Sequence, residues 1–178
     1  MHQDVLAFWF DEINPKSWWA AEPDFDALVR SRFGPLLQQA SAGECFGWRS
    51  ESRGRLAEVI VLDQFSRNIH RGTGQAFTQD PMALALAQEA VAQGACAALS
   101  PAECSFLLMP YMHSESRVVH AQAELLYRNH APEDNYNFEL RHKAIIDRFG
   151  RYPHRNPVLG RDSTLEEVEF LKQPGSKF

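Results

Sequence analysis

Apolar residues recur at intervals of three and four along most of this chain, and almost no segment alternates apolar and polar residues as a half-buried strand does. Phe25, Val29 and Ala40, for example, fall on one face of an α-helix over residues 25–40. Pro35 lies inside this pattern, so we expect the helix to kink or split there. The periodicity predicts an all-α protein.

Glycine, proline and capping residues divide the rest of the chain into further helices. We expect Asp80 before Pro81 to cap one helix, Ser100 with Glu103 to form a capping box at another, and Ser163 and Thr164 with Glu166 and Glu167 to cap the last. Gly94 and Gly150 mark expected helix ends. The predicted segments are residues 53–69, 80–94, 100–110 with a break at Pro110, 114–129, 134–149 and 163–172. Residues 59–62 are apolar on every side, so the first of these helices should be buried, although that β-branched run also suits a strand. No linker divides the chain, which predicts a single domain over residues 1–178 with seven or eight helices, as an irregular bundle or stacked helix pairs.

Bulk composition excludes several classes of protein. The 178 residues carry 18 Lys and Arg against 23 Asp and Glu, and this net charge of −5 disfavours a general nucleic-acid binder. No apolar run approaches the roughly 20 residues that span a bilayer, and the N-terminus lacks the basic start of a signal peptide. Cys45, Cys96 and Cys104 form no CxxC pair, which predicts unpaired, mostly buried thiols in a cytoplasmic protein.

Dense polar chemistry adjoins apolar sequence in three places, the first of them in residues 61–73. Asp63, Arg67 and Arg71 share one helix face at steps of four, with Asn68 beside them. One interpretation is a structural ion pair on a buried helix. The other is that Arg67 and Arg71 present forked donors to a carboxylate or phosphate.

The second polar segment directly follows the apolar residues 106–112. His113 and Glu115 stand where the chain should be deeply buried, so their side chains need partners or a solvent-filled pocket. A structural interpretation gives His113 a backbone carbonyl and Glu115 an arginine or a helix end. The functional alternative is a His/Glu pair for proton transfer or, less favoured, for metal binding.

The third polar segment concentrates the positive charge of the chain. Residues 141–161 hold six Lys and Arg against one acid, a net charge of +5 in a chain whose remainder has a net charge of −10. Arg148, Arg151, His154 and Arg155 alternate there with aromatic and turn residues. The segment predicts an anionic small molecule or an acidic partner, unless its arginines only neutralise helix C-termini and nearby carboxylates.

These same segments carry a resemblance to a known family. The motifs at residues 8–10, 62–68, 109–115 and 148–156 resemble those of the domain of unknown function 924 family, with similarity from Val5 to Leu171. Ser66 departs from the proline usual there. The resemblance implies an α-helical, tetratricopeptide-like superhelix in a soluble, mostly bacterial family, although no internal repeat is visible in the chain. It implies no activity.

Our leading hypothesis is a site for an anionic small molecule. His113 or His154 would carry a proton, and Glu115 or Asp63 would orient the imidazole. The residues expected to bind the ligand are Asp63, Arg67, Asn68, Arg71, Arg148, Arg151 and Arg155. No cofactor or metal is expected, because the phosphate-loop, dinucleotide and zinc-protease motifs are missing from the sequence.

Two other hypotheses compete with it. In the first, the protein is a helical interaction module that holds an acidic peptide or partner protein against Trp18, Trp19 or Trp48, while the polar cluster is purely structural. In the second, His113, Glu115 and His154 support metal-dependent hydrolysis. The arrangement of the three polar segments in the fold distinguishes these hypotheses. Arginines that face an open cavity favour ligand binding, whereas arginines that are paired with carboxylates favour a structural role.

Overall fold

The structure is a computed structural model that describes residues 1–19 and 21–176, and within these residues it is helical with no strand. The all-α prediction is therefore confirmed. The elements, in chain order, are α1 (His2–Leu6), the π-helical turn η1 (Ala7–Glu12), η2 (Pro15–Trp18), α2 (Pro23–Ser41), η3 (Phe46–Ser50), α3 (Ser52–Ile60), the π-helical turn η4 (Val61–Phe65), α4 (Ser66–Ile69), η5 (Gly74–Phe77), α5 (Asp80–Ala92), α6 (Ala95–Ala98), α7 (Pro101–Leu107), α8 (Met109–His113), α9 (Arg117–His130), α10 (Glu133–Phe149), η6 (Pro153–Arg155) and α11 (Leu165–Phe170).

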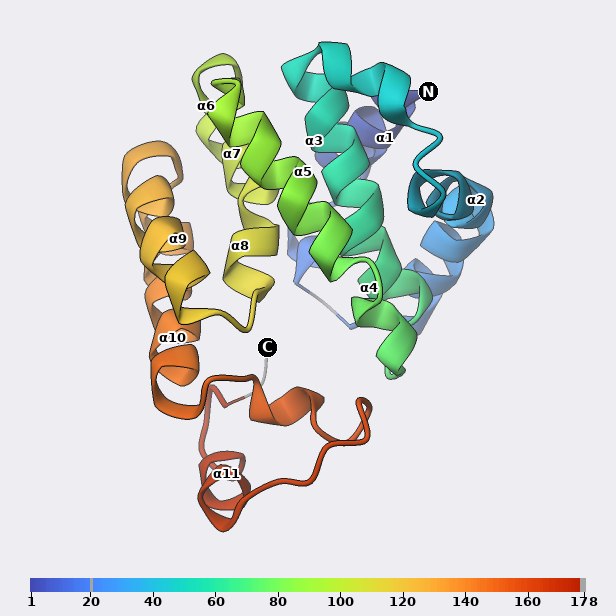
Figure 1. The fold of residues 1–178 in the computed structure, drawn as a ribbon. Helices are drawn as coiled ribbons and strands as arrows, with labels where there is room; N and C mark the ends of the chain where they lie inside the picture. Colours follow the sequence, from blue (N-terminus) through green and yellow to red (C-terminus); the bar gives the residue numbers. More distant parts are fainter. Residues whose placement is uncertain (20, 177–178) are drawn as a thin grey trace.

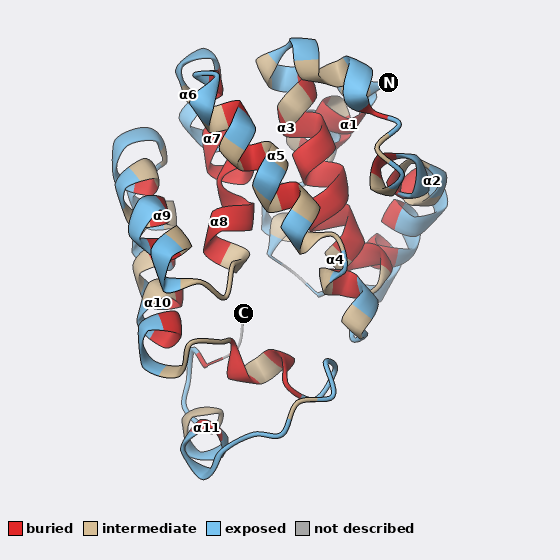
Figure 2. Ribbon diagram, viewed as in Figure 1, coloured by how far each residue is buried: buried red, intermediate tan, exposed pale blue. Residues whose placement is uncertain are grey.

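The centre of the molecule is the continuous helical segment α3–η4–α4, which corresponds to the helix predicted over residues 53–69. Its residues from Leu56 to Ser66 are all buried, and Figure 2 shows most of this segment as buried. The strand alternative for residues 59–62 is not adopted. A wider π-helical turn at Val61–Phe65 interrupts the regular ladder, and such turns are frequent at functional sites.

Several predicted helix ends are confirmed in atomic detail. The Ser100 hydroxyl accepts from the Glu103 backbone N–H, and the Glu103 carboxylate accepts from the Ser100 N–H, which completes a capping box at α7. Thr164 and Glu167 form the same motif at α11. Gly150 ends α10 with φ of 70°, in the left-handed region that glycine adopts at little cost.

One local prediction is wrong and another is narrowed. Of the kink or split expected at Pro35, the split does not occur, because only one intrahelical hydrogen bond is lost there while Phe33 and Leu37 remain in the core. Asp80 was expected to cap α5 with its side chain, but Gln79 is the cap residue and Asp80 is the first residue of the helix. The Asp80 carboxylate is used elsewhere, as described below.

The chain between α7 and α9 turns sharply twice. The break occurs at Leu108, so that Pro110 lies in the first turn of α8, where its missing N–H costs nothing. After His113 the chain is extended, and α9 begins at Arg117 with Ser116 as its cap. The structure therefore has more and shorter helical pieces than the seven or eight predicted.

The helices form an irregular bundle. Figure 1 shows α9 and α10 side by side as an antiparallel pair at one edge, with α3 and α5 in the middle and α1 and α2 at the opposite edge. After α10 the chain returns beneath α8 through η6 before α11. This return is what carries the basic segment back to the middle of the molecule.

The structure corrects the expectation for the cysteines. Cys96 and Cys104, predicted to be unpaired, form a disulfide with a Cα–Cα distance of 5.4 Å, because the short α6 and the turn after it bring α7 back alongside. Cys45 is a free, buried thiol as expected. Within the described part of the chain, no helix combines the length and the apolar character that crossing a membrane requires.

Candidate functional site

The three polar segments meet. They surround a cavity of about 640 Å³ that opens among η2, η4–α4, η5, α8, α10 and η6. The cations that line this cavity, hereafter the central cavity, are Arg67, Arg71 and Arg155; its histidines are His113, His142 and His154; its aromatic residues are Trp18, Trp19, Phe77, Phe138 and Tyr152. None of the described residues that line it is an aspartate or glutamate.

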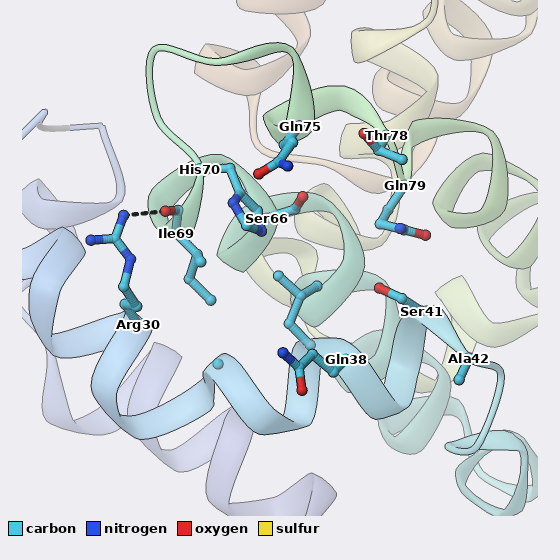
Figure 3. Close-up of a pocket in the computed structure, with 12 residues that line it drawn as sticks. Arg30, Gln38, Ser41, Ala42, Ser66, Ile69, His70, Gln75, Thr78 and Gln79 are labelled. Carbon is cyan, nitrogen blue, oxygen red and sulfur yellow. Dashed lines mark hydrogen bonds between the residues drawn. The ribbon is translucent and has the colours of Figure 1, made fainter.

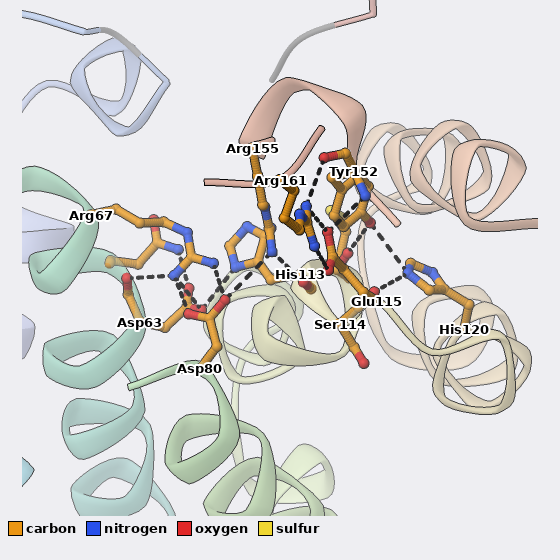
Figure 4. Close-up of polar contacts among 12 residues, drawn as sticks. Asp63, Arg67, Asp80, His113, Ser114, Glu115, His120, Tyr152, Arg155 and Arg161 are labelled. Atoms are coloured by element: carbon orange, nitrogen blue, oxygen red, sulfur yellow. Dashed lines mark hydrogen bonds and ion pairs between the residues drawn. The ribbon is translucent and has the colours of Figure 1, made fainter. Parts of the chain in front are cut away.

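A buried pair joins the first polar segment to the second. The Asp63 carboxylate, fully buried in the π-helical turn, accepts a hydrogen bond from Nδ1 of His113, with an Oδ1–Nδ1 distance of 2.8 Å (Figure 4). It also accepts from Nη1 of Arg67 at 3.0 Å and from the Gln64 amide at 2.5 Å. Burial alone would raise the pKa of Asp63, but the charges of Arg67 and His113 outweigh it and hold that pKa well below its usual range.

Arg67 is held between two carboxylates. Its guanidinium donates to both oxygens of Asp80, at 2.9 and 3.0 Å, as well as to Asp63. This bidentate geometry fixes the plane of the guanidinium. Most hydrogen-bond donors of Arg67 are therefore used by internal partners. What this side chain adds to the central cavity is mainly its positive charge.

Arg155 is the least neutralised of the buried cations. Its guanidinium lies between the rings of Phe77 and Tyr152, at 4.6 and 4.5 Å from their centroids, and Nη1 donates to the His113 carbonyl at 3.0 Å. The nearest carboxylate oxygen that pairs with it, on Asp80, is 3.6 Å away. Its buried Nε–H has no acceptor among the described residues. Burial, reinforced by the charge of Arg67, lowers the pKa of Arg155 to about 10.

The second and third segments are joined through Glu115. Its carboxylate accepts from both Nη atoms of Arg161, at 2.6 and 3.0 Å, and from the Tyr152 backbone N–H at 2.7 Å (Figure 4). Burial opposes ionisation here, but the hydrogen bond from Arg161 dominates and lowers the pKa of Glu115. Glu115 therefore anchors the returning chain and does not orient His113.

Two further histidines of the central cavity are kept neutral. Burial lowers the pKa of His142 to about 3, and its Nδ1–H donates to the Phe138 carbonyl at 2.8 Å. Burial and the nearby charge of Arg155 lower the pKa of His154 to about 4. At neutral pH both rings therefore add polarity to the cavity wall without adding charge.

Not every residue predicted for the site reaches the cavity. Arg148 pairs with Glu166, and Arg151 donates to both oxygens of Glu167, so both arginines fasten α11 and neither lines the central cavity. At the cavity rim, Asn68 and Arg71 both donate to the carboxylate of Asp26, on α2.

Sequence reasoning missed several members of this site. Asp26 and Asp80 are carboxylates that sit behind the arginines, and Phe138 and His142 come from the helix predicted over residues 134–149. Asp80 carries a usable signal, because it stands before Pro81 at an expected helix start, but a capping role accounts for it. The others lie on ordinary amphipathic helices and give no sign in the sequence.

A second cavity, of about 680 Å³, lies between α2 and the α4–η5 region (Figure 3). Amide, hydroxyl and small side chains line most of it, and the Arg30 guanidinium donates to the Ile69 carbonyl at its edge. It contains none of the residues predicted for the site.

The donors proposed for a metal do not cluster. Glu115 is bound to Arg161, while His113 is bound to Asp63, so these two residues of the metal hypothesis point to different partners. Within residues 1–19 and 21–176, no group of three or more His, Cys, Asp or Glu side chains has the arrangement to hold an ion.

An all-helical bundle with a cavity bounded by buried ion pairs is the class of protein that these observations define. Its sequence over residues 5–175 matches the family described as "Bacterial protein of unknown function (DUF924)". The chain belongs to the DUF924 family. It is also similar to the solved structure of a protein of unknown function from Agrobacterium tumefaciens, with 32% sequence identity, a TM-score of 0.91 and 96% of each chain covered. No curated protein gives a significant match.

Proposed function

We propose that the central cavity binds a small molecule that combines a negatively charged group with a flat apolar part. The observation that carries the proposal is Arg155, a 94%-buried cation on the cavity wall whose pairing carboxylate oxygen, on Asp80, is 3.6 Å away. A buried cation without a close counter-ion is costly, and an anion bound in the cavity would stabilise it.

The rest of the wall supports the same ligand class. Three arginines and no carboxylate among the described lining residues favour a negative charge, even though Arg67 and Arg71 also serve internal partners. Trp18, Trp19 and Phe138 offer ring faces on which a flat group can stack. A volume of about 640 Å³ is in the range of small-molecule sites.

The proposal is tested with four probe anions: benzoate, phenyl phosphate, cyclohexanecarboxylate and inorganic phosphate. Calorimetric titration and thermal shift should show that the two aromatic anions bind to the wild-type protein and raise its Tm. Arg155→Met keeps the side-chain volume, removes a poorly paired buried charge, and should lose at least about tenfold in affinity while remaining folded.

Arg128→Gln is the matched control, because this arginine is exposed on α9 and pairs with Glu124 and Tyr136, and none of these three residues lines the cavity. It should bind all four probes as the wild type does. Absence of binding by every probe, or equal affinity in Arg155→Met and wild type, contradicts the proposal.

One observation favours a second candidate, an interaction module that holds an acidic peptide. The Trp19 side chain is 60% exposed beside the cavity that it lines, as expected of a ring that contacts a partner. A peptide that carries an aromatic residue and a negative charge at one end would then bind more tightly than benzoate. The small-molecule proposal predicts that the additional peptide residues give no gain in affinity. The tetratricopeptide-like architecture and the cytoplasmic location stay predictions.

A further inference from the structure

We propose that Asp63 and His113 form a general-base pair, and that the central cavity hydrolyses small carboxylic esters whose acyl part is flat and apolar. This inference rests on the proposed function, because the carboxylate that such a hydrolysis releases is an anion of the class assigned to Arg155. It adds a reaction to what is otherwise a binding site.

The first step of the argument is that Asp63 is immobilised as a carboxylate. Three side chains from different directions donate to it, namely Gln64, Arg67 and His113, and it has no exposed surface. A carboxylate with this many donors is stabilised in its ionised form. It therefore accepts from His113 and does not donate to it.

The second step follows from the first, because the acceptor on Asp63 fixes the tautomer of His113. With the proton on Nδ1, the lone pair of the neutral imidazole is on Nε2. Nε2 makes no hydrogen bond within the described part of the chain, and the ring lines the central cavity with its side chain 12% exposed. A histidine whose role was only to bridge two helices would not need an exposed second nitrogen on a cavity wall.

The third step places an oxyanion donor beside this base. Arg155 donates to the backbone carbonyl of His113 at 3.0 Å, so the guanidinium and the imidazole belong to adjacent parts of one wall. Its guanidinium lines the cavity, and the carboxylate oxygen that pairs with it, on Asp80, is 3.6 Å away. A base and a preorganised cationic donor on one cavity wall are two elements that acyl transfer to water requires.

The reaction balances with water as the second reactant. The water oxygen bonds to the carbonyl carbon while one of its protons passes to Nε2 of His113, and the negative charge on the carbonyl oxygen is stabilised by Arg155. The C–O bond to the leaving group then breaks, and the alcohol oxygen takes the proton from Nε2. The products are an alcohol and a carboxylic acid, which ionises to the carboxylate and releases its proton to solvent, with no oxidant or cofactor consumed.

The direct test measures hydrolysis of 4-nitrophenyl benzoate and 4-nitrophenyl acetate by release of nitrophenolate. The wild-type protein should hydrolyse the benzoate ester above the buffer rate and faster than the acetate. His113→Gln should lose about 100-fold or more in kcat, the usual contribution of a general base. Arg128→Gln should keep the wild-type kcat.

Asp63 is a positioning residue in this scheme, and Asp63→Asn tests it through a readout other than stability. The kcat of the wild type should rise with pH to a plateau, with its inflection below 6.5, because burial and Arg67 lower the pKa of His113. The amide removes a negative charge that favours the imidazolium, so the inflection should move to lower pH while KM changes little. If Asp63→Asn does not fold, His113→Gln decides the question.

Two results overturn the inference. One is hydrolysis of both esters at the buffer rate by a wild-type protein that binds benzoate, which leaves the proposed function standing and removes only the reaction. The other is a His113→Gln variant with wild-type kcat. If benzoate does not bind and neither ester is hydrolysed, the proposed function and this inference both fail.

Discussion

His113 and Asp63 are 50 residues apart in the chain, yet a hydrogen bond of 2.8 Å joins Nδ1 of one to Oδ1 of the other. The bond connects the last residue of α8 to the π-helical turn of the central buried segment. Because both ends lie on packed elements, the imidazole is held in one orientation. This single contact joins the first polar segment of the site to the second.

Arg151→Ala should destabilise the protein and leave anion binding unchanged. Arg151 donates to both oxygens of Glu167 at 2.7 and 2.9 Å and to the Asp162 carbonyl at 2.8 Å, so its loss frees α11 from the loop before η6. Removing these charged hydrogen bonds should lower the free energy of unfolding, measured by urea denaturation. A loss of benzoate affinity in this variant, with stability unchanged, would show that Arg151 belongs to the site.

His142 makes the stability of the protein depend on pH. Burial lowers its pKa in the folded state to about 3 from the ordinary 6.5, so the unfolded chain takes up a proton in this interval that the folded protein does not. Stability is therefore fully present above pH 6.5 and falls as the pH decreases, by about 1.4 kcal/mol per pH unit for this proton. His142→Gln should reduce the slope of unfolding free energy against pH by that amount between pH 6 and 4. An unchanged slope contradicts this account.

Trp19→Leu should weaken ligand binding with little effect on stability. The indole is 60% exposed and stacks on the rings of Phe106 and Phe138 at 5.9 and 6.4 Å between centroids. Loss of one aromatic stacking partner, worth up to about 1.5 kcal/mol, should raise the Kd of benzoate by about tenfold. The Kd of cyclohexanecarboxylate should change less, and equal changes for both acids would argue against ring stacking.

Substitution by alanine should change the stability of the protein in opposite directions at two helical glycines. A Cβ on Gly54, in α3, would collide with the backbone carbonyl of Trp48, whereas a Cβ on Gly34, in α2, would meet no atom within 4 Å. Gly34→Ala should therefore stabilise the protein by about 0.5–1 kcal/mol through the unfolded chain. Gly54→Ala should destabilise it by about 1–3 kcal/mol. Thermal denaturation compares the two, and stabilisation by both variants would be the contrary result.

Much of the local structure was predictable because its causes are local. The capping residues Ser100 and Thr164, and Gly150 at the end of α10, act on the backbone within a few residues of themselves. The burial of Val59–Leu62 followed from an apolar surface on every side. Asp80 shows the limit of this reasoning, since a local capping role was physically sound but a distant arginine offered its carboxylate a stronger partner.

The sequence by itself determined the helices, their main boundaries and the three segments in which charged side chains adjoin apolar ones. Only the tertiary structure decided which charges pair, since Arg151 and Arg155 are four residues apart but face Glu167 and the central cavity respectively. The physical reason is the distance over which each kind of interaction acts. Capping and periodicity act over one or two helical turns, whereas the energy of a buried charge depends on whichever chemical group the rest of the fold places within about 4 Å of it.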